Sequence, residues 1–311
     1  MANPRALLLL LATAAALAAA ACGGSGGSGD DDGTADAPGG DPDPDGWQSL
    51  LRGDWSLPAN TEGYFCVYAT VPRDVDIKAF RPLSPLGTHH TVLTRYQGST
   101  PDGVVPCNFG VNGQSMIYGS GVGAPDFAFP PGVGLHLPAG TRLLLNLHLY
   151  NASDAPIQGT AGTLFQPAAP GELQHLAELV LAGPTLSLAV PTGVTTQSGT
   201  CNVSSITSVP IQVFALSQHM HKLGRNLRSV VVRGTSQIVL QDIPYNFEKQ
   251  EFHLTAQPTE LRPGDVVKTS CTYENSTGAT VRFGESSDDE MCFTDLFYYP
   301  AQGAGYICTS F

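Results

Sequence analysis

Short segments in which apolar and polar residues alternate recur along the chain, and glycine- and proline-rich turns separate them. A period of two is the pattern of β-strands, and hardly any run rich in Ala, Glu and Lys follows the N-terminus to favour a helix. The predicted strands form two series, Tyr64–Val71, Asp76–Phe80, His89–Tyr96 and Leu143–Asn151, then Ile211–His221, Leu227–Arg233, Val266–Tyr273 and Met291–Tyr299. The sequence therefore predicts an all-β fold.

A stretch of turn-forming residues separates the two series of strands. It contains Ala182-Gly183-Pro184 and Val190-Pro191-Thr192-Gly193. Two antiparallel β-sandwiches of ordinary domain size account for the two series, although the halves share no close sequence repeat. We therefore expect one domain at residues 47–183 and a second at 184–311.

The N-terminus has the features of an export signal. Arg5 precedes an apolar run from Ala6 to Ala21 that ends in small residues and is shorter than the about 20 residues of a membrane-spanning helix. Cys22 follows directly, as in the signals of bacterial lipoproteins. We predict a signal peptide at residues 1–22 with lipidation of Cys22, and plain secretion is the alternative. The chain would then be exported and held at a membrane surface, on the periplasmic or extracellular side, by its lipid anchor.

Residues 23–46 contain no core-forming side chain and predict a flexible, acidic Gly/Ser/Asp/Pro tether. Much of the formal net charge of −12 belongs to the aspartates of this tether, so the charge says little about a substrate. The 15 lysines and arginines form no basic stripe, which argues against nucleic acid as a partner.

Besides Cys22, the chain has an even set of cysteines. They are Cys66, Cys107, Cys201, Cys271, Cys292 and Cys308. In an exported chain an even number indicates disulfides, and the sequence leaves the pairing open. A cysteine-rich zinc site is the rival interpretation, but the chain lacks a Cys-x-x-Cys pair.

Several of the eight histidines occupy positions suited to a metal. On the strand Leu143–Asn151 the leucines at 143, 145, 147 and 149 share one face, which predicts that His148 projects from the other face. His219 and His221 are two residues apart on a predicted strand, so both imidazoles can reach one ion; two unrelated surface histidines are the alternative. Small residues precede them on the same face, and Met220 points to the opposite face as a core residue.

Two further motifs are ambiguous when taken alone. The neighbours His89 and His90 can bind one ion only if their strand is distorted or if they use different ring nitrogens. Met291 follows an acidic turn and precedes Cys292. Its thioether with two imidazoles would suit Cu(I), whereas packing within a strand is the simpler explanation.

In combination these motifs resemble one family. The order His-His, a strand histidine, His-x-His-x-Leu-Gly and Glu-Met-Cys is that of the copper type II, ascorbate-dependent monooxygenases. The resemblance runs from about Tyr64 to the C-terminus. It implies two jelly-roll-like antiparallel β-sandwiches that face each other across a water-filled cleft, and the disulfides Cys66–Cys107, Cys201–Cys308 and Cys271–Cys292.

The resemblance also implies two coppers per chain. One would be bound by His89, His90 and His148, and the second by the catalytic set His219, His221 and Met291, where O₂ binds and a substrate C–H bond is hydroxylated. Hydroxylation takes two electrons from outside, so a second copper stores one of them, and three ligands leave a position open for O₂. Ascorbate or another one-electron donor would be the co-substrate, and the physiological donor is open.

Departures from the family pattern bear on the substrate, which is expected to be a small molecule. Peptide-amidating members resemble one another in having an Arg where this chain has Ser217, and an Asn and a Tyr where it has Phe293 and Asp295. We expect Phe293, Asp295 and Phe297 to share the face of Met291, which favours a neutral or cationic substrate over a carboxylate. Asp295 pairing with a nearby Arg or Lys is the alternative. A copper-binding lipoprotein that sequesters or delivers copper without turnover is the rival function.

Overall fold

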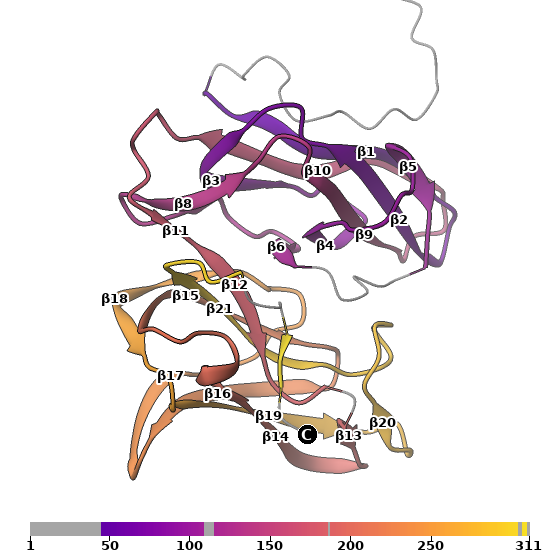
Figure 1. Ribbon diagram of the computed structural model, residues 1–311. Coiled ribbons are helices and arrows are strands. Elements are labelled where there is room, and N and C mark those ends of the chain that lie inside the picture. Colours follow the sequence, from indigo (N-terminus) through magenta and orange to yellow (C-terminus); the bar gives the residue numbers. More distant parts are fainter. Residues whose placement is uncertain (1–44, 109–114, 186, 304–306, 310–311) are drawn as a thin grey trace, which may run out of the picture. The chain divides into compact units, whose positions relative to one another are not determined.

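The computed structural model describes residues 45–108, 115–185, 187–303 and 307–309, and strands dominate it (Figure 1). Within these ranges there is no α-helix, only the 3₁₀ turn η1 (Val203–Ser205), so the all-β prediction is confirmed. No helix among the described residues is long and apolar enough to cross a membrane. The predicted signal peptide with Cys22, and the tether up to residue 44, lie outside the described residues.

The first group of strands forms two sheets. Its members are β1 (Gln48–Leu57), β2 (Thr61–Thr70), β3 (Val75–Leu83), β4 (Thr88–Arg95), β5 (Gly103–Pro106), β6 (Met116–Gly121), β7 (Phe127–Ala128), β8 (Val133–Leu137), β9 (Arg142–Asn151), β10 (Ile157–Pro167) and β11 (His175–Leu176). One sheet has the order β1-β10-β3-β8-β11 with β7 beside β3, and the other has the order β5-β2-β9-β4-β6. Every pairing is antiparallel except that of β11 with β8.

Both of these sheets contribute to one hydrophobic core. Leu51 of β1 and Phe80 of β3 belong to the same buried cluster as Val67 of β2 and Leu93 of β4. The four leucines of β9 at 143, 145, 147 and 149 are fully buried in it, as the alternation predicted. The opposite face of β9 is therefore the one that presents His148.

The second group of strands also forms two main sheets. Its members are β12 (Glu178–Ala182), β13 (Ala189–Val190), β14 (Gly193–Asn202), β15 (Ile211–Met220), β16 (Gly224–Arg233), β17 (Ser236–Pro244), β18 (His253–Leu261), β19 (Val266–Asn275), β20 (Val281–Arg282), β21 (Cys292–Tyr299) and β22 (Ile307–Cys308). The sheet orders are β18-β15-β21-β12-β22 and β14-β19-β16-β17, and β13 pairs with β20. Val213 of β15 and Val267 of β19 pack in one buried cluster, so these two sheets also share a core.

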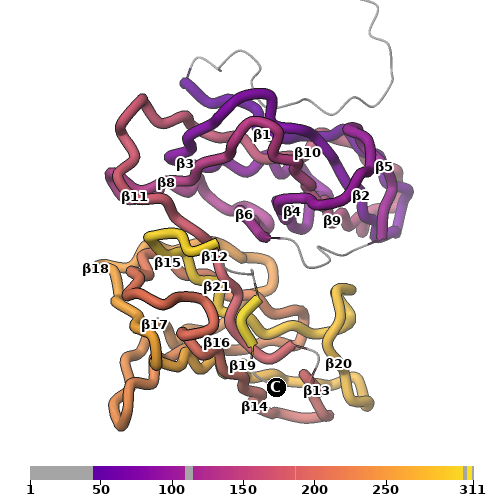
Figure 2. Tube along the Cα trace, viewed as in Figure 1, coloured from indigo at the N-terminus to yellow at the C-terminus, as the bar shows by residue number. Residues whose placement is uncertain are grey.

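The chain changes strand partners at Ala177. β11 before it pairs with β8, whereas β12 after it pairs with β21 and β22, as the colours along the tube in Figure 2 let the reader follow. This exchange precedes the boundary expected at Pro184. The main buried cluster includes Leu179 and Phe297 of the second group, and all described residues belong to one compact unit. The division into domains at 47–183 and 184–311 stays a prediction.

Three disulfides cross-link the described residues, two of them between strands and one between β2 and the residue that follows β5. Cys66 of β2 pairs with Cys107, Cys201 of β14 with Cys308 of β22, and Cys271 of β19 with Cys292 of β21. The pairs are those that the family resemblance implied. Disulfides of this kind form in oxidising compartments, which agrees with an exported protein.

Candidate metal centre

A β-bulge brings the neighbours His89 and His90 to the same side of β4. The pairing of β4 with β9 shifts register between Thr88 and His90, and His90 lies opposite His148. Two residues of a bulged strand oppose one residue of its partner, so both imidazoles can face His148. The distortion required for these neighbours to act together is therefore present.

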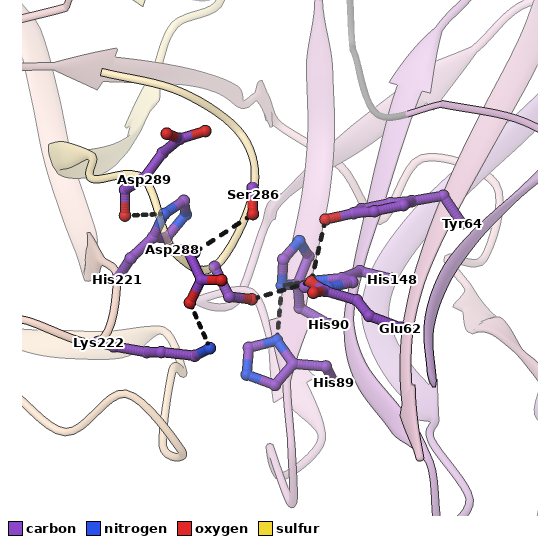
Figure 3. A network of polar contacts seen from close by, with 11 residues as sticks. Glu62, Tyr64, His89, His90, His148, His221, Lys222, Ser286, Asp288 and Asp289 are labelled. Carbon is purple, nitrogen blue, oxygen red and sulfur yellow. Dashed lines mark hydrogen bonds and ion pairs between the residues drawn. The ribbon is translucent and has the colours of Figure 1, made fainter. Parts of the chain in front are cut away.

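The three histidines converge through the same ring nitrogen. Nδ1 of His90 lies 3.0 Å from Nδ1 of His89 and 3.2 Å from Nδ1 of His148, as Figure 3 shows for the first of these contacts. One ligand atom from each residue lies within 4.8 Å of the others. His89 and His90 are half-buried and His148 is 1% exposed, so the cluster is largely shielded from water.

Glu62 on β2 fixes the orientation of His148. Its carboxylate accepts a hydrogen bond from Nε2 of His148, which leaves the lone pair of Nδ1 directed at the other histidines. The Tyr64 ring stacks on the His148 ring with centroids 4.5 Å apart, and its hydroxyl donates to Glu62 over 3.3 Å. The Ser287 hydroxyl, from the turn that precedes Met291, donates to the same carboxylate over 3.2 Å.

A second cluster combines His219, His221 and Met291. Nε2 of His219 lies 3.2 Å from Sδ of Met291, and the two imidazole centroids are 5.3 Å apart. Nδ1 of His219 donates to Oε1 of Gln250 over 2.7 Å, and Nδ1 of His221 donates to the carbonyl of Asp289 over 3.1 Å. Both histidines therefore keep the lone pair of Nε2, the nitrogen opposite to the one that converges in the first cluster.

Glu290 and Tyr273 hold the backbone of this second cluster. The carboxylate of Glu290 is fully buried and accepts hydrogen bonds from the amides of His221 at 3.0 Å and Leu223 at 2.7 Å. Burial raises the pKa of Glu290 to about 7. The hydroxyl of Tyr273 donates to the carbonyl of Met291 over 2.7 Å. Met220 packs in the core behind, as its place on the strand predicted.

The histidines of both clusters are neutral at physiological pH. Burial lowers the pKa of His89 to about 4 and that of His221 to about 3. Burial also lowers the pKa of His148 and His219, and brings the pKa of His90 well below its usual range. Neutral imidazoles can serve as metal ligands, whereas imidazolium cannot.

The donor sets fit metal ions, and copper in particular. An N–H···N hydrogen bond can satisfy one pair of these neutral imidazoles, whereas a metal cation would accept a lone pair from all three at once. Three imidazoles suit copper, and a thioether with two imidazoles is a soft set that favours Cu(I). The centroids of His90 and His219, one from each cluster, are 6.2 Å apart. The other histidines, His136, His175 and His253, lie outside both clusters.

A small cavity adjoins both clusters. His90 and His219 line it together with Ser217 of β15 and Asp295 of β21, which lie opposite each other in register. Asp295 forms no ion pair with any described residue, so the alternative in which it pairs with a nearby Arg or Lys is not observed. Phe293 and Phe297 pack in the hydrophobic core, Phe293 with its ring centroid 6.5 Å from that of His219.

Sequence reasoning did not identify the residues that orient the ligands. Glu62 and Gln250 have no motif of their own, and only the folded chain places them beside histidines distant in sequence. Glu290 is the first residue of the Glu-Met-Cys motif, but its role is not evident from that motif. Its hydrogen bonds to the amides of His221 and Leu223 depend on the turn that follows β15 in the folded chain.

Comparison with known proteins finds similarity to copper-dependent monooxygenases. The family described as "Copper type II ascorbate-dependent monooxygenase, C-terminal domain" matches residues 176–310. The human putative DBH-like monooxygenase protein 2 is 25% identical over 273 residues, which cover 78% of this chain and 54% of the relative. Human dopamine beta-hydroxylase is 28% identical over 277 residues, which cover 78% of this chain and 44% of the relative. These matches bear out the resemblance to the copper type II, ascorbate-dependent monooxygenases, and the matched family model covers the C-terminal part of the chain.

A third relative has a different named substrate class. Peptidyl-glycine alpha-amidating monooxygenase A of Xenopus laevis is 28% identical over 257 residues, which cover 78% of this chain and 27% of that protein. The chain thus spans between about a quarter and about half of the length of these relatives.

Proposed function

We propose that this protein is a copper-dependent monooxygenase that hydroxylates a C–H bond of a small organic substrate with O₂ and an external one-electron donor such as ascorbate. The observation that carries the proposal is the pair of adjacent clusters with unlike donors, three imidazoles in one and two imidazoles with a thioether in the other. A protein that only stores copper has no evident use for this asymmetry, whereas two redox sites with separate tasks require it.

The proposed ligands are those of the sequence analysis. His89, His90 and His148 would hold one copper, and His219, His221 and Met291 would hold the second, the catalytic one. Copper bound here would supply electrons and bind O₂. The chain supplies the tautomers, since Glu62 and Gln250 each hold one ring N–H and leave the other nitrogen free. The Met291 sulfur favours the reduced ion that must meet O₂.

The wider arrangement is part of the same proposal. The two groups of strands would be two jelly-roll-like β-sandwiches on either side of a cleft. Export would follow from a signal peptide at 1–22, and Cys22 would carry a lipid that holds the protein at a membrane surface through the tether 23–46.

The test is oxygen uptake by copper-loaded protein reduced with ascorbate, against a panel of amines, phenethyl compounds and acyl-glycines. With ¹⁸O₂, the product is expected to gain one labelled oxygen atom. Arg262→Ala provides a control, because this exposed side chain pairs with Glu260 and belongs to neither cluster. Tight binding of two coppers with no substrate-dependent uptake across the panel would favour copper sequestration or delivery instead.

A further inference from the structure

The cavity beside the two clusters has one charged group in its lining that nothing neutralises. It offers about 40 Å³ to the atoms of a ligand or water, within about 350 Å³ of empty space that extends into solvent. The smaller volume exceeds the about 10–15 Å³ that one water needs, so a group of the size of an ammonium fits. Among the described residues the lining includes no lysine or arginine.

Asp295 is the charged group in question. Its side chain is 5% exposed, and Oδ1 is buried without a hydrogen-bond partner among the described residues. Burial raises the pKa of Asp295 to about 7. A buried carboxylate without a partner is costly and is commonly explained by a ligand that completes the site.

The surroundings of Asp295 define the ligand further. The opposite residue on β15 is Ser217, whose hydroxyl is small and uncharged, and Gln218 and Gln250 add neutral polar groups to the lining. Met116 and Phe252 contribute apolar surface. A ligand with one cationic group and an apolar body would match this combination, whereas a carboxylate would be repelled by Asp295.

The position of Asp295 relates the cation to the proposed catalytic cluster. Ser217 and His219 are two residues apart on β15, about 7 Å along one face of the strand. A cation held at Asp295 would therefore direct the body of the ligand along β15, past the His219 side chain that also lines the cavity.

We propose that Asp295 is the specificity-determining residue of a cation subsite, and that the substrate is an amine whose ammonium group pairs with this carboxylate. That the bound amine is a substrate rests on the proposed function. The subsite itself is a binding site, so it can be tested without turnover. Phe293 has no part in the subsite, because it packs in the core.

Three probes of nearly equal shape test the subsite: 3-phenylpropylamine, 3-phenylpropan-1-ol and 3-phenylpropanoate. Their binding is measured by calorimetry on the metal-free and on the copper-loaded protein. A charged hydrogen bond in a buried site is worth about 10- to 100-fold in affinity. The wild type is expected to bind the amine at least about 10-fold more tightly than the alcohol. Asp295→Asn should bring the two within about twofold and leave the alcohol unchanged. Asp242→Asn is the control, because that carboxylate is half exposed and pairs with Arg228.

A second variant keeps the proposal testable if Asp295→Asn does not fold. Ser217→Lys would place an ammonium group opposite Asp295 and should abolish the preference for the amine while the alcohol still binds. Equal affinity of the wild type for amine and alcohol, tighter binding of the carboxylate, or equal losses for all three probes in Asp295→Asn would overturn the proposal. Oxygen uptake separates the two hypotheses. Selective amine binding without uptake would refute only the monooxygenase, and equal uptake with all three probes would refute only the subsite.

Discussion

Replacing Asp295 by Asn should stabilise the metal-free protein at alkaline pH. The pKa of Asp295 rises from 3.8 to about 7 on folding because burial disfavours the charged form. The folded state therefore binds more protons than the unfolded state between these values, and the free energy of unfolding falls as the pH rises from about 4 to about 7. Each pKa unit is worth about 1.4 kcal/mol, so the penalty above pH 7 amounts to about 4 kcal/mol.

Asn has nearly the shape of Asp and carries no charge, so the variant escapes this penalty. Urea unfolding with intact disulfides, followed by circular dichroism, should show Asp295→Asn more stable than the wild type by about 4 kcal/mol at pH 8 and by less than about 1 kcal/mol at pH 4. Asp242→Asn is the matched control, since its carboxylate is half exposed and pairs with Arg228. A gain of equal size at both pH values would mean that ionisation of Asp295 is not its cause, and a loss at pH 8 would mean that the carboxylate has a partner in the folded protein.

Three further predictions concern the metal clusters. His148→Ala should retain about one of two coppers by elemental analysis, and retention of both or of neither would contradict the two-cluster assignment. Met291→Ile keeps a similar volume, so its circular dichroism and copper content should resemble the wild type while oxygen uptake falls severely; full activity would show that the thioether is dispensable. Glu62→Gln should weaken copper at the three-histidine cluster about 10- to 100-fold in a chelator competition and alter its electron paramagnetic resonance spectrum, and an unchanged affinity would remove Glu62 from a positioning role.

The fold class could be predicted from the sequence because strand alternation is a local property. All eight predicted strands correspond to observed ones, and the burial of the leucines of β9 followed from the period of two. Strands such as β1 and β10 were not predicted, because glycines interrupt their alternation, as Gly53 does in β1 and Gly159 and Gly162 do in β10.

The ligand candidates were also visible in the sequence, but not their arrangement. The sequence offered His89 and His90 only as an ambiguous pair, since a bulge depends on how β4 pairs with β9. The contact of His148 with Glu62 joins residues 86 positions apart, and that of Ser287 with Glu62 joins residues 225 positions apart. The lack of a partner for Asp295 is a property of its whole surroundings, which no local pattern contains.

The bulge at His89 separates the metal-binding task of β4 from its folding task. From His90 onward the burial alternates as in a regular strand, since Thr91 and Leu93 are buried whereas His90 and Val92 are half-buried. His89 is therefore an additional residue that the core does not need. Its deletion would leave the register of the rest of β4 intact and remove one imidazole, whereas a deletion further along β4 would move every later side chain to the opposite face. A chain that gained or lost this single residue would change its metal chemistry while it kept the same strand pairings.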